Sequence, residues 1–271
     1  MELVIRPKKM ISMRDITELW KYRELLYFFS WKELKVRYKQ TAIGVVWALF
    51  QPFISMVVFS LFFGKLAKMP SDGIPYPIFV YVGLLIWQFF SSALSETSNC
   101  LINNQGIISK IYFPRLILPI SSVLTKLVDF FVSSFMLFGM MIYYHYYPDF
   151  VGLLIMPLLL VLSFMLAVGA GLLLASINVK YRDVRYVLPF FIQTLLFVTP
   201  VIYPVSIAGK YSWILALNPM TGVINAAHAA VFGNAPINWG LLGESAIISV
   251  VILAAGVYVF KKTEKYFVDL I

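Results

Sequence analysis

A basic cluster followed by a long uncharged run places the strongest constraint on how this chain can fold. Lys180, Arg182, Asp183 and Arg185 lie within six residues, and the next stretch, 186–204, contains no charged residue. Cytoplasmic loops rich in Lys and Arg flank membrane-spanning helices in this way. The stretch therefore predicts a loop that leads into a membrane helix over 187–203.

The composition indicates several such helices. Hydrophobic residues make up 61% of the 271 residues and charged residues 13%, whereas soluble domains are about half apolar and about a quarter charged. We predict an all-α integral membrane protein with a single membrane domain, 43–271. The only cysteine, Cys100, excludes an internal disulfide and a cysteine metal cluster, and we predict no metal site. The first ten residues lack the apolar region of a signal peptide.

Six stretches have about the apolar length that a helix needs to cross a bilayer. They are 43–63, 78–98, 119–143, 151–176, 187–203 and 241–260. A further apolar stretch, 213–233, is broken by Asn218, Pro219 and Gly222. Broken helices at membrane depth are tolerated where they are buried in protein or line a cavity.

Charge decides whether 213–233 crosses the membrane. If it does not, all but three of the 22 Lys and Arg residues lie on one side, and the exceptions are Lys65, Lys68 and Lys210. The positive-inside rule strongly prefers this arrangement. We therefore predict six spans, a re-entrant helical pair within 204–240, and both termini in the cytoplasm.

Residues 1–42 predict an amphipathic helix that lies in the membrane interface. Asp15 and Glu18 favour a helix start. One face is apolar: Leu19, Tyr22, Leu26 and Phe29, widened by Trp20, Phe28 and Trp31. The other face is charged: Lys21, Glu24, Lys32, Lys35 and Lys39. Such helices put their apolar side in lipid and their lysines at headgroups. The helix could be a basic anchor, or a lever that also contacts a cytoplasmic partner.

The loop 99–118 is too polar to span the membrane. Its central sequence IISKIYF (107–113) could form a short helix before Pro114. A short cytoplasmic helix would offer a contact to a soluble motor subunit, and the alternative is a plain connector.

Polar and aromatic residues inside the predicted spans are candidate functional residues. Glu96, Lys126 and Asp129 are charged, and charges at depth usually pair and face protein or water. A structural pair between Lys126 and Asp129, or a link to Glu96, is favoured over a proton relay. Lys126 could instead extend to the near interface. Trp87, Phe89 and Phe90 lie at mid-depth, where they could line a sugar path or simply pack.

Motifs for catalysis and for ATP binding are absent from the sequence. It contains no GxxxxGK[ST], HExxH or GxSxG, and His145 and His228 are isolated. The net charge of +9 is compatible with nucleic acid, but charges gathered on one membrane side set topology and contact anionic lipid. We predict a non-enzymatic transport path with energy from another subunit, no nucleic-acid partner, and contact with membrane lipid.

Four stretches resemble the membrane (permease) subunits of type-2 ABC exporters of lipid-linked polysaccharide. They are KVRYKQTAIGVVWALFQP (35–52), LINNQGIISKIYFPRLILP (101–119), NVKYRDVRYVLPFFIQTLLFVTPVIYP (178–204) and LNPMTGVI (217–224). The spans between them agree in length and order, so the resemblance covers nearly the whole chain. After LNPMT, where similar permeases often carry a charged residue, this chain has NAAHAAVFG.

The resemblance implies a homodimer in the bacterial cytoplasmic (inner) membrane, with the path at the subunit interface. It implies two copies of a separate ABC ATPase subunit that uses ATP and Mg, with no cofactor in this chain. The substrate would be a polyprenyl-diphosphate-linked glycan such as O-antigen, capsule or teichoic acid. The segment 207–232 would form two short re-entrant helices near the external mouth.

The resemblance also assigns roles to residues. Contacts to the ATPase are expected from the loop 99–118 and the basic cluster: Asn104, Gln105, Ile108, Lys110, Tyr112, Phe113, Arg182 and Asp183. The lipid diphosphate is expected near Lys35, Arg37, Arg182 and Arg185, and the sugar chain along Trp87, Phe89, Phe90, Phe197 and Tyr203. Two other functions stay open: an ABC exporter of a drug or small lipid, and an integral enzyme acting on a lipid-linked sugar.

Overall fold

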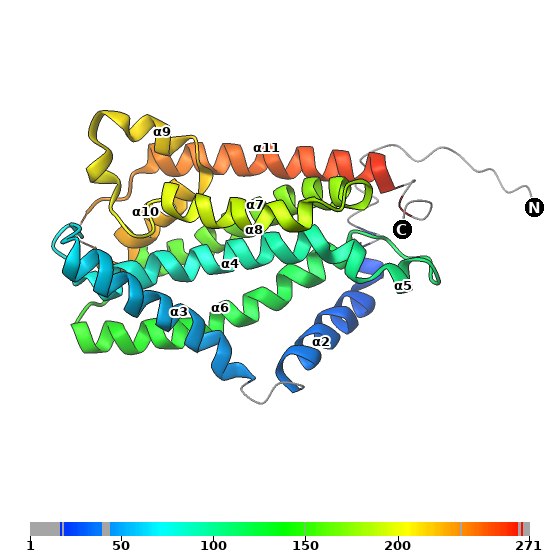
Figure 1. Ribbon diagram of the computed structural model, residues 1–271, viewed down its shortest axis with the longest axis horizontal. Helices are drawn as coiled ribbons and strands as arrows, with labels where there is room; N and C mark the ends of the chain where they lie inside the picture. Colours follow the sequence, from blue (N-terminus) through cyan, green and yellow to red (C-terminus); the bar gives the residue numbers. More distant parts are fainter. Residues whose placement is uncertain are drawn as a thin grey trace, which may run out of the picture.

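The structure is a computed structural model that describes residues 17, 19–39, 44–148, 150–233, 235–264 and 267. The described residues form helices joined by short connections and contain no strand (Figure 1). The helices are α2 (Arg23–Lys39), α3 (Val45–Phe59), its π-helical continuation η1 (Ser60–Leu66), α4 (Tyr76–Asn103), α5 (Gln105–Ile108), α6 (Ile117–Tyr144), α7 (Phe150–Lys180), α8 (Val184–Val198), η2 (Val205–Tyr211), α9 (Ser212–Ala216), α10 (Pro219–Phe232) and α11 (Trp239–Thr263). The predicted helix start at Asp15 and Glu18 lies outside the described residues.

Within the described part of the chain, five helices are long and apolar enough to cross a membrane. They are Val46–Leu66, which joins α3 to η1, and the helices α4, α6, α7 and α11. The prediction of an all-helical membrane protein is confirmed. Each of the five corresponds to a predicted span, although α4 continues past the predicted end at residue 98 as far as Asn103.

The fifth predicted span, 187–203, corresponds to the shorter apolar helix α8, which ends at Val198. Thr199 is extended, with φ −81° and ψ 140°. Pro200 follows it, and a proline disfavours helical backbone at the preceding residue and cannot donate a backbone hydrogen bond. The sequence Thr-Pro therefore ends the helix before the predicted boundary.

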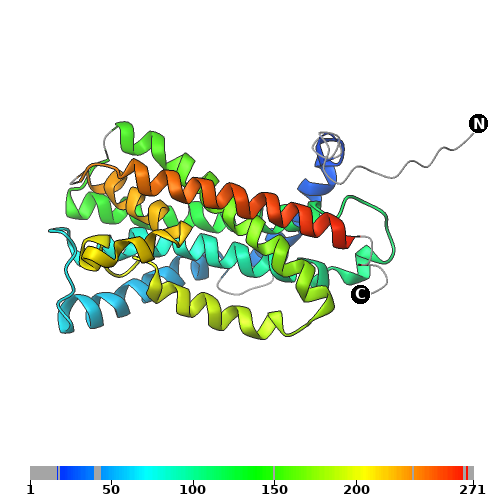
Figure 2. The same ribbon diagram turned by 90° about the horizontal axis from the view of Figure 1, so that it is seen from above.

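Helix α4 is the centre of the bundle, and most of its side chains are buried. Helices α6, α7, α10, α3 and α8 contact it, and α11 packs on α7 and α10 (Figures 1 and 2). The contact with α7 is close because Gly171 has no side chain. A Cβ atom there would lie 2.4 Å from the Thr97 side chain of α4.

The segment 204–240 forms short helices, with a break between α9 and α10 at Leu217 and Asn218. The Asn218 side chain accepts a hydrogen bond from the Met220 amide at 3.0 Å and donates one to the Thr199 hydroxyl at 2.8 Å. It therefore caps α10 and fixes it to the end of α8. Figure 1 shows this segment at the end of the bundle opposite α5, beside the loop before α4.

Helix α2 lies obliquely against α6 (Figure 1). The Phe29 ring packs on Phe113, just before α6, with 5.6 Å between ring centroids. Two turns further along α2, the Arg37 guanidinium contacts the Asp129 carboxylate, well inside α6. The contacts advance along both helices in the same order, so α2 runs alongside the first half of α6.

The predicted faces of the N-terminal helix are partly confirmed. The lysines of the charged face are exposed: Lys21, Lys32, Lys35 and Lys39. On the apolar face, Phe29 is buried against the protein. Three further large residues, Trp20, Phe28 and Trp31, are exposed. The apolar side is thus divided between the bundle and the surroundings.

Candidate functional site

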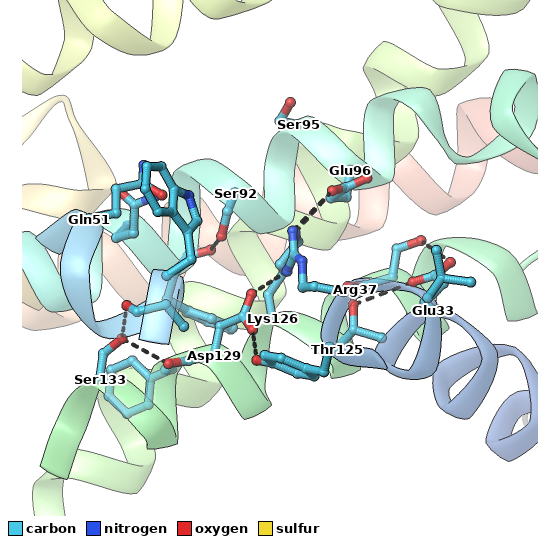
Figure 3. A pocket seen from close by; sticks show the side chains of 18 of the residues that line it. Glu33, Arg37, Gln51, Ser92, Ser95, Glu96, Thr125, Lys126, Asp129 and Ser133 are labelled. Carbon is cyan, nitrogen blue, oxygen red and sulfur yellow. Dashed lines mark hydrogen bonds and ion pairs between the residues drawn. The ribbon is translucent and has the colours of Figure 1, made fainter. Parts of the chain in front are cut away.

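A cleft of about 1140 Å³ lies between α2, α3, α4 and α6 (Figure 3). Polar side chains from all four helices line it. Those of α4 are Gln88, Ser92, Ser95, Glu96 and Asn103, followed by its C-cap Asn104. Those of α6 are Ser122, Thr125, Lys126, Asp129 and Ser133. Helix α2 adds Lys32, Glu33, Arg37 and Tyr38, and α3 adds Gln51. The spacing of three, four and seven residues on α4 and α6 puts each set on one helix face.

A network of charges joins three of these helices. Arg37 of α2 contacts Asp129 of α6 and lies 3.7 Å from Glu96 of α4. Lys126 Nζ lies 2.9 Å from Glu96 Oε1. The Lys126 side chain is only 4% exposed, so its charge depends on this carboxylate. The predicted link from Lys126 to Glu96 is confirmed, whereas Asp129 takes Arg37 as a partner.

Two residues of α2 complete the network. The Glu33 carboxylate accepts hydrogen bonds of 3.3 Å from Ser122 and Thr125. Burial raises the pKa of Glu33 above its usual value, and the negative charge of Glu96 raises it further by a smaller amount. The Tyr38 hydroxyl donates to Asp129. Burial and this carboxylate raise the pKa of Tyr38, which keeps its phenol protonated as a donor.

The sequence analysis missed Glu33 and Tyr38. Phe29, Glu33 and Arg37 recur every fourth residue, which places them on one face of α2. That face is the one in contact with α6. Among the described residues, no group of three or more His, Cys, Asp and Glu is arranged to hold a metal ion.

The loop that leads from α4 to α6 is anchored at its α6 end and exposed just before these anchors. Phe113 is buried against α2, and Arg115 donates to the Glu264 carbonyl and lies over the Phe267 ring at 5.8 Å. Between α5 and these anchors, Ile111 and Tyr112 are exposed, with Tyr112 at 86%.

The expected helix over 107–113 is wrong in extent, because α5 covers only Gln105–Ile108. The amides of Ile107 and Ile108 bond to the Asn104 carbonyl, which begins the helix there. Pro114 disfavours helical backbone at Phe113, so the helix does not continue to that residue.

Comparison with known proteins then gives the family. Residues 24–232 match the family described as ABC-2 type transporter. The chain belongs to this family. It is 29% identical over 261 residues to the O-antigen export system permease protein RfbA of Myxococcus xanthus, covering 95% of this chain and 99% of that protein. The O-antigen export system permease protein RfbA of Klebsiella pneumoniae is 25% identical, and the match covers 92% of this chain and 95% of that protein. The polysialic acid transport protein KpsM of Escherichia coli is 23% identical, and the match covers 86% of this chain and 91% of that protein.

In this ABC-2 transporter, the residues predicted for ATPase contact are gathered at one end of the bundle. Gln105, Lys110 and Tyr112 are exposed on the loop, while Ile108 is buried and Asn104 donates to the Cys100 carbonyl at 2.9 Å. Arg182 and Asp183 are exposed on the turn between α7 and α8. Figure 1 shows this turn and α5 at the same end.

The residues predicted to contact a lipid diphosphate are not brought together. Lys35, Arg182 and Arg185 are exposed, whereas Arg37 lies in the cleft with Glu96 and Asp129. Figures 1 and 2 place α2 and the turn between α7 and α8 on opposite sides of the bundle.

The predicted aromatic path is also divided. Trp87 and Phe90 are buried inside the bundle, with 5.5 Å between their ring centroids. Phe89 is buried at the wall of the cleft. Phe197 is exposed on α8, and Tyr203 is half-buried with its hydroxyl donating to the Val198 carbonyl at 2.8 Å. The path through these residues stays a prediction.

Proposed function

We propose that this chain is the membrane subunit of an ABC exporter that moves a polyprenyl-diphosphate-linked, O-antigen-like polysaccharide across the bacterial cytoplasmic membrane. One observation carries this proposal: the similarity to O-antigen export permeases extends over nearly the whole length of both chains. The transport protein for polysialic acid, another polysaccharide, is similar over a smaller share. ATP would be hydrolysed, with Mg, by two copies of a separate subunit, since the sequence has no P-loop.

Six spans with cytoplasmic termini are part of the proposal. Helix α8, with residues 199–203 that follow it, would be the fifth span in chain order, and η2, α9 and α10 would re-enter from the outside. The distribution of charge supports this orientation. The loop after α5, the turn between α7 and α8 and the last turn of α11 lie at one end of the bundle (Figure 1), and they carry Lys110, Arg182 and Lys262. The loop before α4 and η2 lie at the opposite end, and they carry Lys68 and Lys210.

Homodimer formation through α8 is the second part. Among the described helices, only α4 and α7 pack closely on α8, and its aromatic side chains project outward, with Phe190 72% exposed. Gln193 and Thr194 are also exposed, in the middle of the helix. Polar groups at membrane depth face protein or water rather than lipid. We place α8 against the second copy and the transport path, with Phe197 and Tyr203 as path residues.

The exposed loop provides the contact to the ATPase. Ile111 and Tyr112 form an apolar projection beside α5, and Lys110 adds a charge. Movement of this loop would reach the membrane region through Phe113, because Phe113 packs on α2 and α2 holds Asp129 through Arg37. ATP binding would thus shift α2 and open the dimer interface, and the glycan would pass along weakly binding aromatic side chains.

Purification of the tagged chain from native membranes in mild detergent tests this function. A co-purifying ATPase in a ratio near one to one is the expected result. Tyr112→Ala should lose the ATPase. Tyr143→Ala should retain it, because Tyr143 is also exposed but lies in the last turn of α6, and α6 ends at the opposite end of the bundle (Figure 1). A chain that purifies without an ATPase would favour the alternative function, an integral enzyme acting on a lipid-linked sugar. Stimulation of the ATPase by amphiphiles, with no change in surface glycan, would favour a small-lipid exporter.

A further inference from the structure

The cleft between α2, α3, α4 and α6 has polar walls that run deep into the bundle. On α4 its polar residues extend from Gln88 to Asn103, about 22 Å along the helix axis. On α6 they extend from Ser122 to Ser133, opposite this face (Figure 3). A polar surface of this length is not compatible with lipid tails, so it needs water or a polar ligand.

The charges in the cleft are balanced. Three carboxylates, Glu33, Glu96 and Asp129, line it together with three cations, Lys32, Arg37 and Lys126. Arg37 and Lys126 are engaged with Glu96 and Asp129. A site with no excess charge does not recruit an anion by its field. The diphosphate is therefore a poor occupant, and an uncharged polar molecule suits the cleft better.

Hydrogen-bonding groups remain available in the cleft. Within the described part of the chain, the side-chain amides of Gln51 and Gln88 make no hydrogen bond, and both line the cleft. An amide offers two donors and an acceptor, which matches adjacent hydroxyl groups on a sugar ring. Glu96 is 42% exposed and keeps acceptor capacity beside its contacts to Lys126 and Arg37.

Aromatic rings supply the second element of sugar recognition. Trp47, Phe89 and Phe130 line the cleft from α3, α4 and α6. The apolar C–H faces of a sugar stack on such rings while its hydroxyls bond to the amides and carboxylates. The volume, about 1140 Å³, exceeds the roughly 300–1,000 Å³ typical of small-molecule sites, which leaves room for more than one sugar unit.

We propose that this cleft within a single subunit is a carbohydrate-binding site that holds uncharged sugar residues of the transported glycan. Gln51 and Gln88 bind hydroxyls, Trp47 stacks, and the Arg37–Glu96–Asp129 network keeps α2 in place as one wall. The inference rests on the proposed export of a glycan. It differs from the proposed path at the dimer interface because the cleft lies between α2, α3, α4 and α6, whereas that path runs along α8.

Site-specific photocrosslinking tests the site in cells that make the glycan. Trp47 is replaced by photoreactive p-benzoylphenylalanine in a strain that lacks the natural copy. Phe138 is replaced in the same way as the matched control, because it is 56% exposed against 55% for Trp47 and lies outside the cleft. After irradiation, the Trp47 variant should shift to a ladder of higher apparent mass that stains for carbohydrate, and the Phe138 variant should not. The ladder should disappear in cells that cannot start glycan synthesis.

The amount of surface glycan, measured before irradiation, distinguishes a failure of the proposed sugar site from a failure of the proposed export function. Val36 lines the cleft and has no assigned role in sugar binding. If the photoreactive variant at Val36 restores export and neither it nor the Trp47 variant gives an adduct, the cleft does not hold the glycan and the inference is overturned, while the proposed function stands. If deleting the chain leaves surface glycan unchanged, the proposed function itself fails. Val36, another exposed residue of the cleft, provides the same measurement from α2 if the Trp47 variant is not produced.

Discussion

The two sides of α4 differ sharply in how they are packed. On the side of α4 that faces α7 and α10, the helices α7, α10 and α11 approach one another until backbones touch, with glycine at the contacts. A Cβ atom on Gly256 would lie 2.2 Å from the Gly169 carbonyl oxygen, and one on Gly222 would lie 2.4 Å from the Leu241 carbonyl oxygen. Toward α2, α3 and α6 the same helix borders an open, polar cleft. The difference indicates a fixed half and a half that can bind and move.

The largest effect is expected on the fixed side, for Gly256→Ala. The new methyl group would collide with the backbone of α7, which cannot move away as a side chain can. We expect a loss of stability at or above the upper end of the about 1–3 kcal/mol typical of overpacking, measured as thermal unfolding in detergent. Gly243→Ala on the same helix meets no atom within 4 Å and should be neutral or gain about 0.5–1 kcal/mol. Equal melting temperatures for the two variants would contradict the close contact.

On the cleft side, Glu96→Gln removes the partner of the buried Lys126. We expect a loss of about 1–3 kcal/mol, because the buried ammonium of Lys126 loses its counter-charge although the glutamine oxygen can still accept a hydrogen bond. The double variant Glu96→Gln/Lys126→Met should recover much of this loss, since no buried charge remains. The same unfolding assay compares them, and a double variant less stable than the single one would rule out the dependence of Lys126 on Glu96.

A smaller effect is expected from pH at Glu33. Its pKa is raised from 4.5, mainly by burial, so the docked state of α2 binds the proton more tightly than the released state. The contribution of Glu33 to the free energy of docking is therefore at its maximum below about pH 4.5. It declines as the pH rises through the raised pKa, by less than about 1.4 kcal/mol for each pH unit.

Hydrogen exchange of the α2 amides, corrected for the intrinsic pH dependence, measures this docking. Exchange should accelerate in the native chain as the pH rises through that range and stay flat in Glu33→Gln. The same slope in both proteins would assign the pH dependence to another group.

The smallest effect on the stability of the single chain is expected for Phe190→Ala on the exposed face of α8. Surface substitutions usually stay within about 0.5 kcal/mol, and Phe190 has few contacts within its own chain. The dimer fraction, measured by light scattering in detergent, should nevertheless fall. Val250→Ala on the exposed face of α11 is the control. An unchanged dimer fraction for Phe190→Ala would move the proposed interface away from α8.

The membrane spans could be predicted from sequence because a lipid bilayer requires little more than apolar length. The helix ends were predicted less well, because Thr199 and Pro200 end α8 at Val198, before the predicted boundary at residue 203. The break between α9 and α10 could be located because Asn218 and Pro219 are strong helix-start residues.

The partners of the charged residues were harder to predict. Lys35 and Arg37 are both basic residues on an amphipathic helix, yet Arg37 enters the cleft while Lys35 is exposed. Helical periodicity gives the faces of α2 but does not say which helix each face contacts. For Lys126 the sequence offered two carboxylates, and only the packing of α4 on α6 selects Glu96 as its close partner.

Surface polysaccharide in the source strain, with and without this chain, is the most direct measurement of its proposed role. Deletion should remove the polysaccharide from the cell surface and leave lipid-linked glycan inside the cell. The chain should restore export only when its ATPase partner is also present. Unchanged surface polysaccharide after deletion, or loss without accumulation of the lipid-linked precursor, would contradict an export subunit.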